Sequence, residues 1–286
     1  MRNAMNLLAF GLLVAGGGTN AFIAPKTFVR TLPNVLYMGW GPEPIWSSAK
    51  IAANESACKS EASVCLKVEL ENEESSKEYN VPGQYVQLRL DDDTKPLFLA
   101  IASPPDEESN VFEFLVKKTE GNEWLTSASS GAAVQISQVL GNGFPIDEEL
   151  DSLKYDFPTQ NVILLAAGSG IAPIKAAVES GLLKTGESGG RTARLYYGER
   201  TSDDLCFVED FVKWEAAGVE VVPVLSQSPD EWQGRLGYVQ NALEEDGVPI
   251  PRNSGALLCG MKGMAESVKD ILTKAGTFEG RVLTNF

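Results

Sequence analysis

The sequence contains no histidine, and this absence excludes several classes of site at once. The sequence therefore excludes Ser-His-Asp and Cys-His catalysis, histidine-ligated zinc and histidine-ligated haem. Cysteine is also scarce: Cys58, Cys65, Cys206 and Cys259 lie scattered, so the sequence indicates neither a disulfide framework nor a metal motif. An enzyme of this composition would depend on a bound organic cofactor for difficult chemistry.

Basic residues are few, with 24 Lys and Arg against 39 Asp and Glu and a net charge of −15. Residues 1–45 hold three cations and one acid, so the rest of the chain carries −17. Such a chain repels nucleic acid and anionic membrane surfaces. Its 286 residues, 43% of them hydrophobic, suffice for two domains with buried cores and exclude wholesale disorder.

The N-terminal segment has the composition of a targeting sequence. A positive residue, an apolar run too short to span a bilayer and small residues before Phe22 predict a signal peptide over residues 1–21, and a core helix is the alternative. Residues 22–46 carry two cations and no acid before Glu43, as transit peptides do. The junction NAFIAP resembles the Ala-Phe-x-Pro signature of plastid presequences in diatoms and related algae. We therefore expect import into the plastid (chloroplast) and no transmembrane segment in the mature chain.

The remaining chain divides into two parts of different periodicity. Residues 58–150 contain short alternating segments, which predict a closed antiparallel β-barrel. The alternating segments are residues 63–70, 83–90, 111–118 and 133–140. In residues 158–286, apolar strands alternate with helical segments, one of them over 204–218, which predicts an α/β doubly wound parallel sheet. Residues 148–160 are the expected linker.

A glycine-rich turn follows the first strand of the second part. The segment LLAAGSGIAPIKAAVES, residues 164–180, joins an apolar strand to a helix through Gly168-Ser169-Gly170, with Pro173 in the first helical turn. The glycines permit a sharp turn and close approach of an anion, and the missing N–H of proline costs nothing there. The free N–H groups and the helix dipole would bind a pyrophosphate. Taken alone, the motif is also compatible with a plain tight turn.

Further motifs resemble the ferredoxin–NADP reductase superfamily in order and spacing. AAGSGIAP is followed by YYGER at 196–200 and by CGMKGM at 259–264, as the nucleotide segments of that family are. The segments PGQYVQLRL, AIAS at 100–103 and VLGNGF at 139–144 resemble its flavin-binding barrel. The resemblance covers about residues 58–286 and implies FAD and NAD(P)H as cofactors.

The resemblance also implies a nucleotide site. The residues that match its segments are Gly168, Ser169, Gly170, Ile171, Ala172, Pro173, Gly198, Arg200, Ser226, Arg235, Tyr238, Cys259, Gly260 and Met261. Cys259 matches the thiol beside the nicotinamide and is the candidate catalytic residue, with a core position as the alternative. Arg200 would contact the nucleotide or else be a solvated surface charge. Gln227 stands where members that prefer NADPH often have arginine and Arg235 is a possible substitute, so the choice between NADH and NADPH stays open.

The flavin segments depart from the family pattern. Where the family has Arg-x-Tyr-Ser, this chain has Leu97-Phe98-Leu99-Ala100, without the pyrophosphate-binding arginine or the stacking tyrosine. The residues that match the flavin segments are Leu99, Ala100, Ile101, Ala102, Ser103, Gly121, Thr126, Ser127 and Phe286. Backbone groups of residues 100–102 are expected to hydrogen-bond the flavin ring. Phe286 would lie against the flavin or close the last strand.

The resemblance implies a flavin-dependent oxidoreductase that passes hydride from NAD(P)H to FAD and electrons to a small-molecule or protein acceptor. Ferredoxin is not the expected acceptor, because ferredoxins are acidic and a chain at −17 repels them. Neither a metal nor a nucleic acid is expected. The alternative is a non-catalytic nucleotide-binding or scaffold subunit of a larger plastid complex, favoured by the loss of the flavin signature at residues 97–100.

Overall fold

A computed structural model describes residues 43–285 except residues 73, 152–153 and 228–230. The predicted signal peptide and the predicted transit peptide as far as residue 42 lie outside the described residues, as does Phe286. No helix in the described part of the chain is long and apolar enough to cross a membrane.

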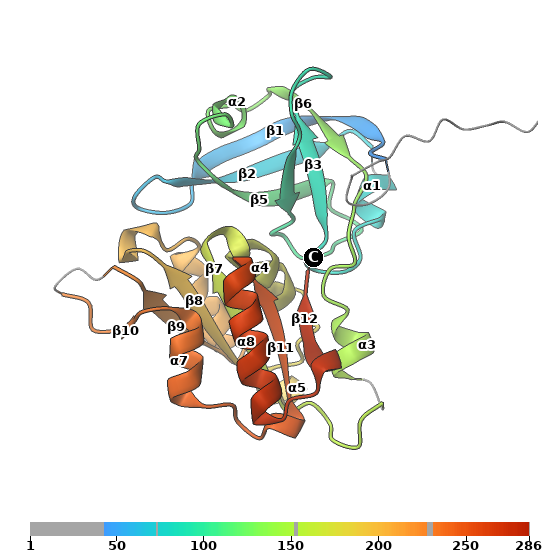
Figure 1. Cartoon of the computed structure of the whole chain (residues 1–286). Helices are drawn as coiled ribbons and strands as arrows, with labels where there is room; N and C mark the ends of the chain where they lie inside the picture. The colour runs from blue at the N-terminus through green and yellow to red at the C-terminus, as the bar shows by residue number, and fades with distance from the viewer. Residues whose placement is uncertain (1–42, 73, 152–153, 228–230, 286) are drawn as a thin grey trace, which may run out of the picture. The chain divides into compact units, whose positions relative to one another are not determined.

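The first domain is a nearly closed antiparallel barrel of six strands in the order β4-β3-β6-β1-β2-β5 (Figure 1). Its strands are β1 (Trp46–Ser56), β2 (Ser63–Leu70), β3 (Tyr85–Arg89), β4 (Leu97–Ala100), β5 (Val111–Lys117) and β6 (Ala133–Ser137). The short helices α1 (Glu74–Lys77) and α2 (Glu123–Thr126) lie in its connections. A bridge between Ile101 and Phe114 joins the segment after β4 to β5. The predicted barrel is confirmed.

Strand β1 places the start of the barrel before the predicted boundary at residue 58. It pairs with both β2 and β6, and its first residue, Trp46, overlaps the last residue assigned to the transit peptide. A bulge between Ile51 and Ala53 breaks the alternation in a segment rich in serine and alanine. Because neither the period nor the composition is typical of a strand, the sequence pattern did not reveal β1.

Inward-facing side chains of the barrel form one apolar core. Ile51, Leu66, Val68, Phe114 and Ile136 are all buried in it. On β2 the even-numbered residues 64, 66, 68 and 70 are buried, which is the two-residue period expected of a strand with one solvated face.

The second domain is a six-stranded parallel sheet in the order β10-β9-β8-β7-β11-β12. Its strands are β7 (Asn161–Ala167), β8 (Thr192–Glu199), β9 (Val219–Leu225), β10 (Arg235–Leu236), β11 (Ser254–Cys259) and β12 (Val282–Thr284). Its helices, with α3 preceding β7, are α3 (Ile146–Leu150), α4 (Ile171–Glu179), α5 (Gly186–Gly189), α6 (Phe211–Ala216), α7 (Val239–Asp246) and α8 (Lys262–Ala275). Because the chain adds β8 and β9 on one side of β7 and then β11 on the other, the strand order reverses between β7 and β11.

Two predicted segments differ from the structure. The helix expected over residues 204–218 is reduced to α6 and short 3₁₀ turns, because Phe207 has a left-handed backbone with φ of 58°. The expected linker, residues 148–160, contains the last part of α3.

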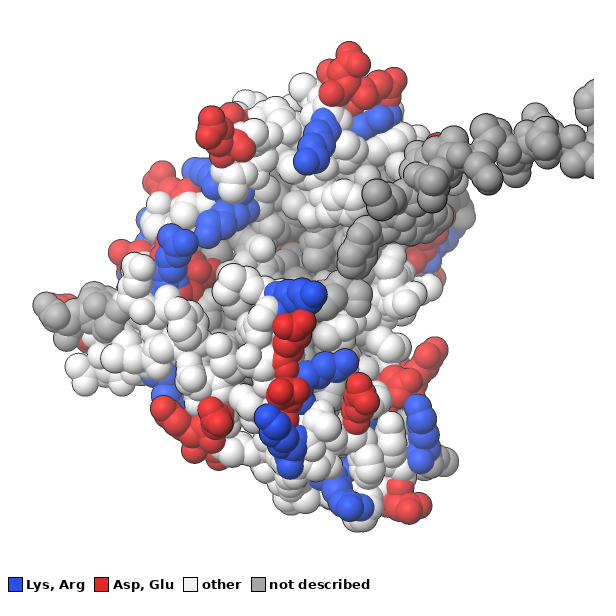
Figure 2. Space-filling model, viewed as in Figure 1, with Lys and Arg blue, Asp and Glu red and all other residues white. Residues whose placement is uncertain are grey.

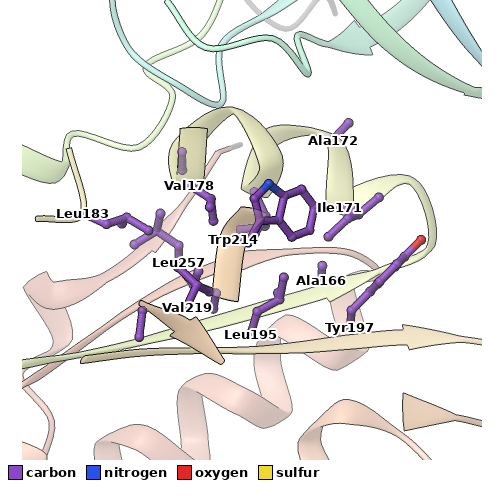
Figure 3. Close-up of a cluster of buried hydrophobic side chains, with 14 of the residues drawn as sticks. Ala166, Ile171, Ala172, Val178, Leu183, Leu195, Tyr197, Trp214, Val219 and Leu257 are labelled. Carbon is purple, nitrogen blue, oxygen red and sulfur yellow. The ribbon is translucent and has the colours of Figure 1, made fainter. Parts of the chain in front are cut away.

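Apolar side chains cover both faces of the parallel sheet. On one face Trp214 of α6 lies among Ile171, Val178 and Leu195 (Figure 3). Its indole N–H donates to Glu179 at 3.1 Å, so the buried nitrogen has a partner. Helices α7 and α8 contact each other and supply the core of the other face.

Candidate functional site

The carboxyl ends of β7, β8, β9 and β11 meet at one edge of the sheet and bring predicted residues together. In the register of the sheet Cys259 lies beside Ala166, and Gly198 lies between Ala167 and Val224. The predicted residues at this edge are Gly168, Ser169, Gly170, Ile171, Ala172, Pro173, Gly198, Arg200, Ser226, Cys259 and Gly260. Tyr238 and Met261, both exposed, precede α7 and α8 at the same edge. Ligands of such sheets bind at this edge, next to the point where the strand order reverses.

The turn Gly168–Gly170 requires glycine at both ends for different reasons. Gly168 has φ of +58°, and no atom lies within 4 Å of the Cβ position it lacks. At Gly170 a Cβ would lie 2.2 Å from the carbonyl oxygen of Cys259, so α4 begins in direct contact with β11. As the N-cap residue of α4, Gly170 has no side chain to cap the first N–H groups. The open space at Gly168 and the uncapped helix end fit a pyrophosphate.

Cys259 lies beside a side chain that the sequence did not single out, Asn285. Burial raises the pKa of the Cys259 thiol to about 12, although a hydrogen bond with Asn285 lowers it. Asn285 Nδ2 also donates to the carbonyl oxygen of Gly83 in the barrel, at 3.4 Å. Its Oδ1 is buried and has no hydrogen-bond partner among the described residues. An unpaired acceptor beside a neutral thiol suits the amide N–H₂ donor of a nicotinamide.

Glu199 is a second residue that the sequence did not identify, although it precedes Arg200 in the motif YYGER. Burial raises the pKa of its carboxyl group, and the hydroxyl of Tyr197 donates to it at 3.4 Å. The backbone ties this strand end to β9, because Ser226 donates to the Glu199 carbonyl and Gln227 to the Arg200 carbonyl. The exposed Arg200 is therefore held one strand away from the glycine turn.

Arg235 is paired with two acids of α7, and its contact with a nucleotide stays a prediction. Its guanidinium pairs with Glu245 at 2.9 Å and with Asp246, both in the last turn of α7. Helix α7 begins at the carboxyl edge and has eight residues, so its last turn lies about 12 Å from that edge. Two carboxylates within reach of one cation account for this orientation.

In the flavin segment on β4, main-chain groups are more available to a ligand than side chains are. Ile101 N–H donates to the Gln84 carbonyl and Ala102 N–H to a carbonyl of β5, so two of the expected donors are already used. In an antiparallel ladder, hydrogen-bonded residue pairs alternate with pairs that are not hydrogen-bonded. Because Ile101 is bonded to Gln84, the next pair, Tyr85 and Ala100, is not hydrogen-bonded, and the N–H of Ala100 faces away from β3. Leu99 is only partly buried beside it. The strand edge fits a flat apolar ring.

In the second flavin segment both hydroxyl groups have backbone partners, and their contact with a phosphate stays a prediction. Thr126 donates to the Asn122 carbonyl, and Ser127 donates to the Glu123 carbonyl, so both protons are used within α2. Gly121, with φ of +102°, borders open space. Since residues 97–103 and 121–127 include no Lys or Arg, neither segment supplies a cation for the FAD pyrophosphate.

Lys175 of α4 connects the candidate site to the barrel. Its ammonium lies 3.4 Å from Glu113 of β5 and 2.6 Å from Glu179, and its side chain is 8% exposed. Burial lowers its pKa, but hydrogen bonding and charge interaction with the two carboxylates outweigh this and hold the pKa above its usual value. The helix that begins at the glycine turn is thereby ionically bound to the first domain.

Cavities elsewhere in the sheet domain do not include the predicted residues. Cavities of about 710 Å³ and about 410 Å³ are lined by the amino ends of β7, β8 and β9 and by neighbouring loops. They lie at the edge opposite to the one where such sheets bind ligands. No group of three or more His, Cys, Asp or Glu side chains that could hold a metal ion occurs in the described part of the chain.

Charged side chains of both signs are mixed on the surface. On the face shown in Figure 2, Lys and Arg lie among Asp and Glu instead of forming one basic patch. Several of the acids pair with cations, as Glu71 does with Lys50 at 3.0 Å.

Comparison with known proteins finds one matching family model and curated relatives. The family model described as oxidoreductase NAD-binding domain matches residues 164–270. The fruit protein pKIWI502 of Actinidia deliciosa is 35% identical over 212 residues, which are 71% of this chain and 65% of that protein. The NAD(P)H-flavin reductase of Vibrio harveyi is 24% identical over 195 residues, 67% of this chain and 79% of that protein. This chain therefore spans slightly less than two thirds of the length of pKIWI502.

Solved structures share the two-domain fold. The Amycolatopsis cytochrome P450 reductase GcoB has a TM-score of 0.68 and 22% identity over 86% of this chain and 70% of its own. A ferredoxin NADP⁺ reductase from Neisseria gonorrhoeae with bound FAD and NADP has a TM-score of 0.68 and 15% identity over 85% of this chain and 98% of its own. The predicted fold class, a barrel followed by a doubly wound parallel sheet, is confirmed.

Proposed function

We propose that this chain is an NAD(P)H-dependent flavin oxidoreductase. The family model and the solved structures support a ferredoxin reductase-like FAD/NAD-binding oxidoreductase. The observation that carries the proposal is the contact between the glycine turn and the end of β11. There Gly170 meets the Cys259 carbonyl, and Asn285 links the Cys259 thiol to Gly83 of the barrel.

In the proposed mechanism the chain positions two rings and supplies no proton. The turn at Gly168 holds the pyrophosphate, and Asn285 Oδ1 accepts from the nicotinamide amide beside the neutral thiol of Cys259. When bound, the flavin supplies the chemistry, which is acceptance of a hydride and transfer of electrons to the acceptor. Catalysis then rests on orientation and on exclusion of water, consistent with a sequence without histidine.

We further propose that the flavin exchanges readily. The barrel offers the N–H of Ala100 and the apolar side chain of Leu99, but residues 97–103 and 121–127 carry no cation to bind a pyrophosphate. A charge-assisted hydrogen bond contributes about 1.5–3 kcal/mol, so its absence weakens FAD binding at least tenfold. The name of the Vibrio harveyi relative, NAD(P)H-flavin reductase, supports the use of flavin as a substrate.

The proposed acceptor is a small molecule or a protein other than ferredoxin. A net charge of −17 after residue 45 and the absence of a basic patch on the face in Figure 2 both disfavour an acidic partner. The plastid location is likewise proposed, from the composition of the presequence and its NAFIAP junction. A fluorescent fusion of residues 1–46 that stays outside plastids in a diatom would contradict it.

A scaffold role is the second candidate, and one observation favours it. Leu97 and Leu99 replace the side chains that hold flavin in the family, while the nucleotide turn is complete. On this proposal the chain binds NAD(P)H, transfers no electrons and serves as a subunit of a larger plastid complex.

An absorption spectrum of the full chain with added FAD, before and after anaerobic NADH and then NADPH, separates the two candidates. The oxidoreductase proposal predicts flavin absorbance that bleaches with reduced nucleotide. Flavin that neither binds nor bleaches, in a protein that still binds nucleotide, would overturn it and leave the scaffold.

A further inference from the structure

Two cysteines from different domains meet at the boundary between the barrel and the sheet domain. Cys58 lies in the turn that joins β1 to β2, and Cys206 lies in the segment that follows β8. The two thiols hydrogen-bond to each other, and both side chains belong to the same apolar cluster. Neither thiol takes part in the proposed transfer of hydride, so the pair has a chemistry of its own to explain.

Hydrogen bonds between the two segments hold this pair in place. The turn between β1 and β2 lies against the segment after β8 (Figure 1), where Ser60 N–H donates to the Asp203 carbonyl at 2.9 Å. The Ser60 hydroxyl donates to the Asp204 carboxylate at 2.7 Å and lies 3.4 Å from Cys58 Sγ. The Cys206 thiol donates to the Asp204 carbonyl at 3.5 Å. The same two neighbours, Ser60 and Asp204, therefore position both thiols.

The backbones of the two cysteines are anchored as well. The Cys58 carbonyl accepts from Glu61 N–H at 3.1 Å and from the Ser56 hydroxyl at 2.8 Å. The Cys206 N–H donates to the Tyr197 hydroxyl at 3.1 Å. A disulfide requires side chains that face each other and an S–S bond of about 2 Å. Two thiols in contact across anchored backbones need only small side-chain rotations to reach that length.

The two thiols differ in exposure, and exposure sets the order in which they react. Cys58 is partly exposed, whereas Cys206 is 1% exposed. Burial raises the pKa of the Cys206 thiol to about 12, and the neighbouring Cys58 thiol adds to the rise, so part of it disappears once Cys58 has reacted. Because exchange needs a thiolate that can reach the other sulfur, Cys58 is the thiol that meets an external disulfide and Cys206 is the resolving thiol beside it.

We propose that Cys58 and Cys206 form a reversible disulfide by exchange with a small-molecule disulfide such as glutathione disulfide, and that this bond joins the barrel covalently to the sheet domain. Cys58 Sγ attacks one sulfur of glutathione disulfide, whose S–S bond breaks, and one glutathione thiol leaves. Cys206 Sγ then attacks Cys58 Sγ, the mixed disulfide breaks, and the second glutathione thiol leaves. Two protein thiols are oxidised, one disulfide is reduced, and both protons pass to glutathione sulfurs. The inference goes beyond the proposed function, because the exchange needs neither flavin nor nucleotide.

Peptide mapping by mass spectrometry, on the full chain incubated with glutathione disulfide under native conditions, tests the proposal. We expect a peptide pair that joins Cys58 to Cys206 with the loss of two hydrogen atoms and that dithiothreitol separates. Cys206→Ser should stop the reaction at a mixed disulfide of Cys58 with glutathione, and Cys58→Ser should leave Cys206 as a thiol. Cys65→Ser is the matched control, because the Cys65 thiol hydrogen-bonds to Glu113 instead, and it should give the linked pair in wild-type yield.

Thermal unfolding is the second readout. Because the two cysteines are far apart in the chain, the disulfide closes a long loop and restricts the unfolded chain. The oxidised wild type should therefore unfold at a Tm at least about 5 °C above that of the reduced protein, and Cys206→Ser should show no such rise.

Three results would overturn the proposal. These are a wild type that takes up glutathione at Cys58 without forming the linked pair, a disulfide between Cys58 and Cys65 instead, and a linked pair that leaves the Tm unchanged. In each case Cys206 is a core side chain only. The proposed function would still stand, because bleaching of flavin by reduced nucleotide tests it separately.

Discussion

At the scale of the residue, Gly170 belongs to a sequence motif and also has a structural reason to be glycine. The Gly-Ser-Gly motif predicted a sharp turn before a helix, and residues 168–170 form a 3₁₀ turn before α4. The motif does not reveal that the second glycine is needed because β11, about 90 residues away in the chain, passes against it. Arg235 is the converse case, since no local pattern indicates that its partners are Glu245 and Asp246.

Gly170→Ala should therefore damage the site without any added charge. The new Cβ would lie 2.2 Å from the Cys259 carbonyl, so α4 or β11 must move. We expect a loss of about 2 kcal/mol in unfolding free energy and at least a tenfold weaker affinity for 5′-ADP. Gly263→Ala is the control, because the added Cβ has no atom within 4 Å and lies in α8, where alanine is favoured. Wild-type affinity in Gly170→Ala would refute the close contact.

Cys259 should remain a neutral thiol over the working pH range. Burial raises its pKa from 9.0 to about 12, so iodoacetamide at pH 8 should label it far more slowly than Cys58, as measured by mass spectrometry. A raised pKa in the folded state contributes stability that is complete below pH 9 and lost as pH rises toward 12. The wild type should thus lose stability relative to Cys259→Ser from pH 9 to pH 11. A constant difference would contradict this.

At the scale of the element, the strands that the sequence predicted are those with an undisturbed period. Strands β2, β7 and β9 lie where alternation or a continuous apolar run placed them. The sequence did not reveal strand β1 because a bulge interrupts it. The helix predicted over residues 204–218 was too long because the left-handed backbone of Phe207 turns the chain before α6. Strand β4 is short and lies at the edge of the sheet. Its position depends on its pairing with β3 more than on its own sequence pattern.

Strand β4 offers a direct test of the proposal that flavin binding is weak. Leu97→Arg with Leu99→Tyr restores the cation and the aromatic ring on one side of the strand, since alternate residues share a face. We expect FAD affinity to rise at least tenfold, measured by quenching of flavin fluorescence. Phe98→Arg, which adds a cation on the opposite, 59% exposed side, should have little effect. Equal gains from both variants would point to general charge attraction.

At the scale of the whole molecule, the two domains and the reversal of strand order were predictable from the change in periodicity. The contacts between the domains were not, because they join residues far apart in the chain. Lys175 with Glu113, and Ser60 with Asp204 at 2.7 Å, are examples. Both cross from the barrel to the sheet domain, and a single lysine in an apolar helix gives no sign that its partner lies on a distant strand.

Glu113→Gln should destabilise the chain by about 2 kcal/mol in urea unfolding. It leaves Lys175 buried with Glu179 as its remaining close carboxylate, and removing one partner of a buried pair is costly. Lys269→Ala is the control, because its pair with Glu279 at 3.7 Å is exposed and should contribute less than about 1 kcal/mol. Equal effects of the two substitutions would show that the pair with Glu113 is no stronger than a surface pair.

The bond between Lys175 and Glu113 also limits how the domains can be recombined. A chimera that joins this sheet domain to another barrel keeps the lysine but brings a carboxylate only if the donor has one at the position of Glu113 on β5. Without it, a buried ammonium ion loses one of its two neutralising groups at the helix that follows the glycine turn. Compatibility of exchanged halves should therefore follow the residue at that single barrel position more closely than overall sequence identity.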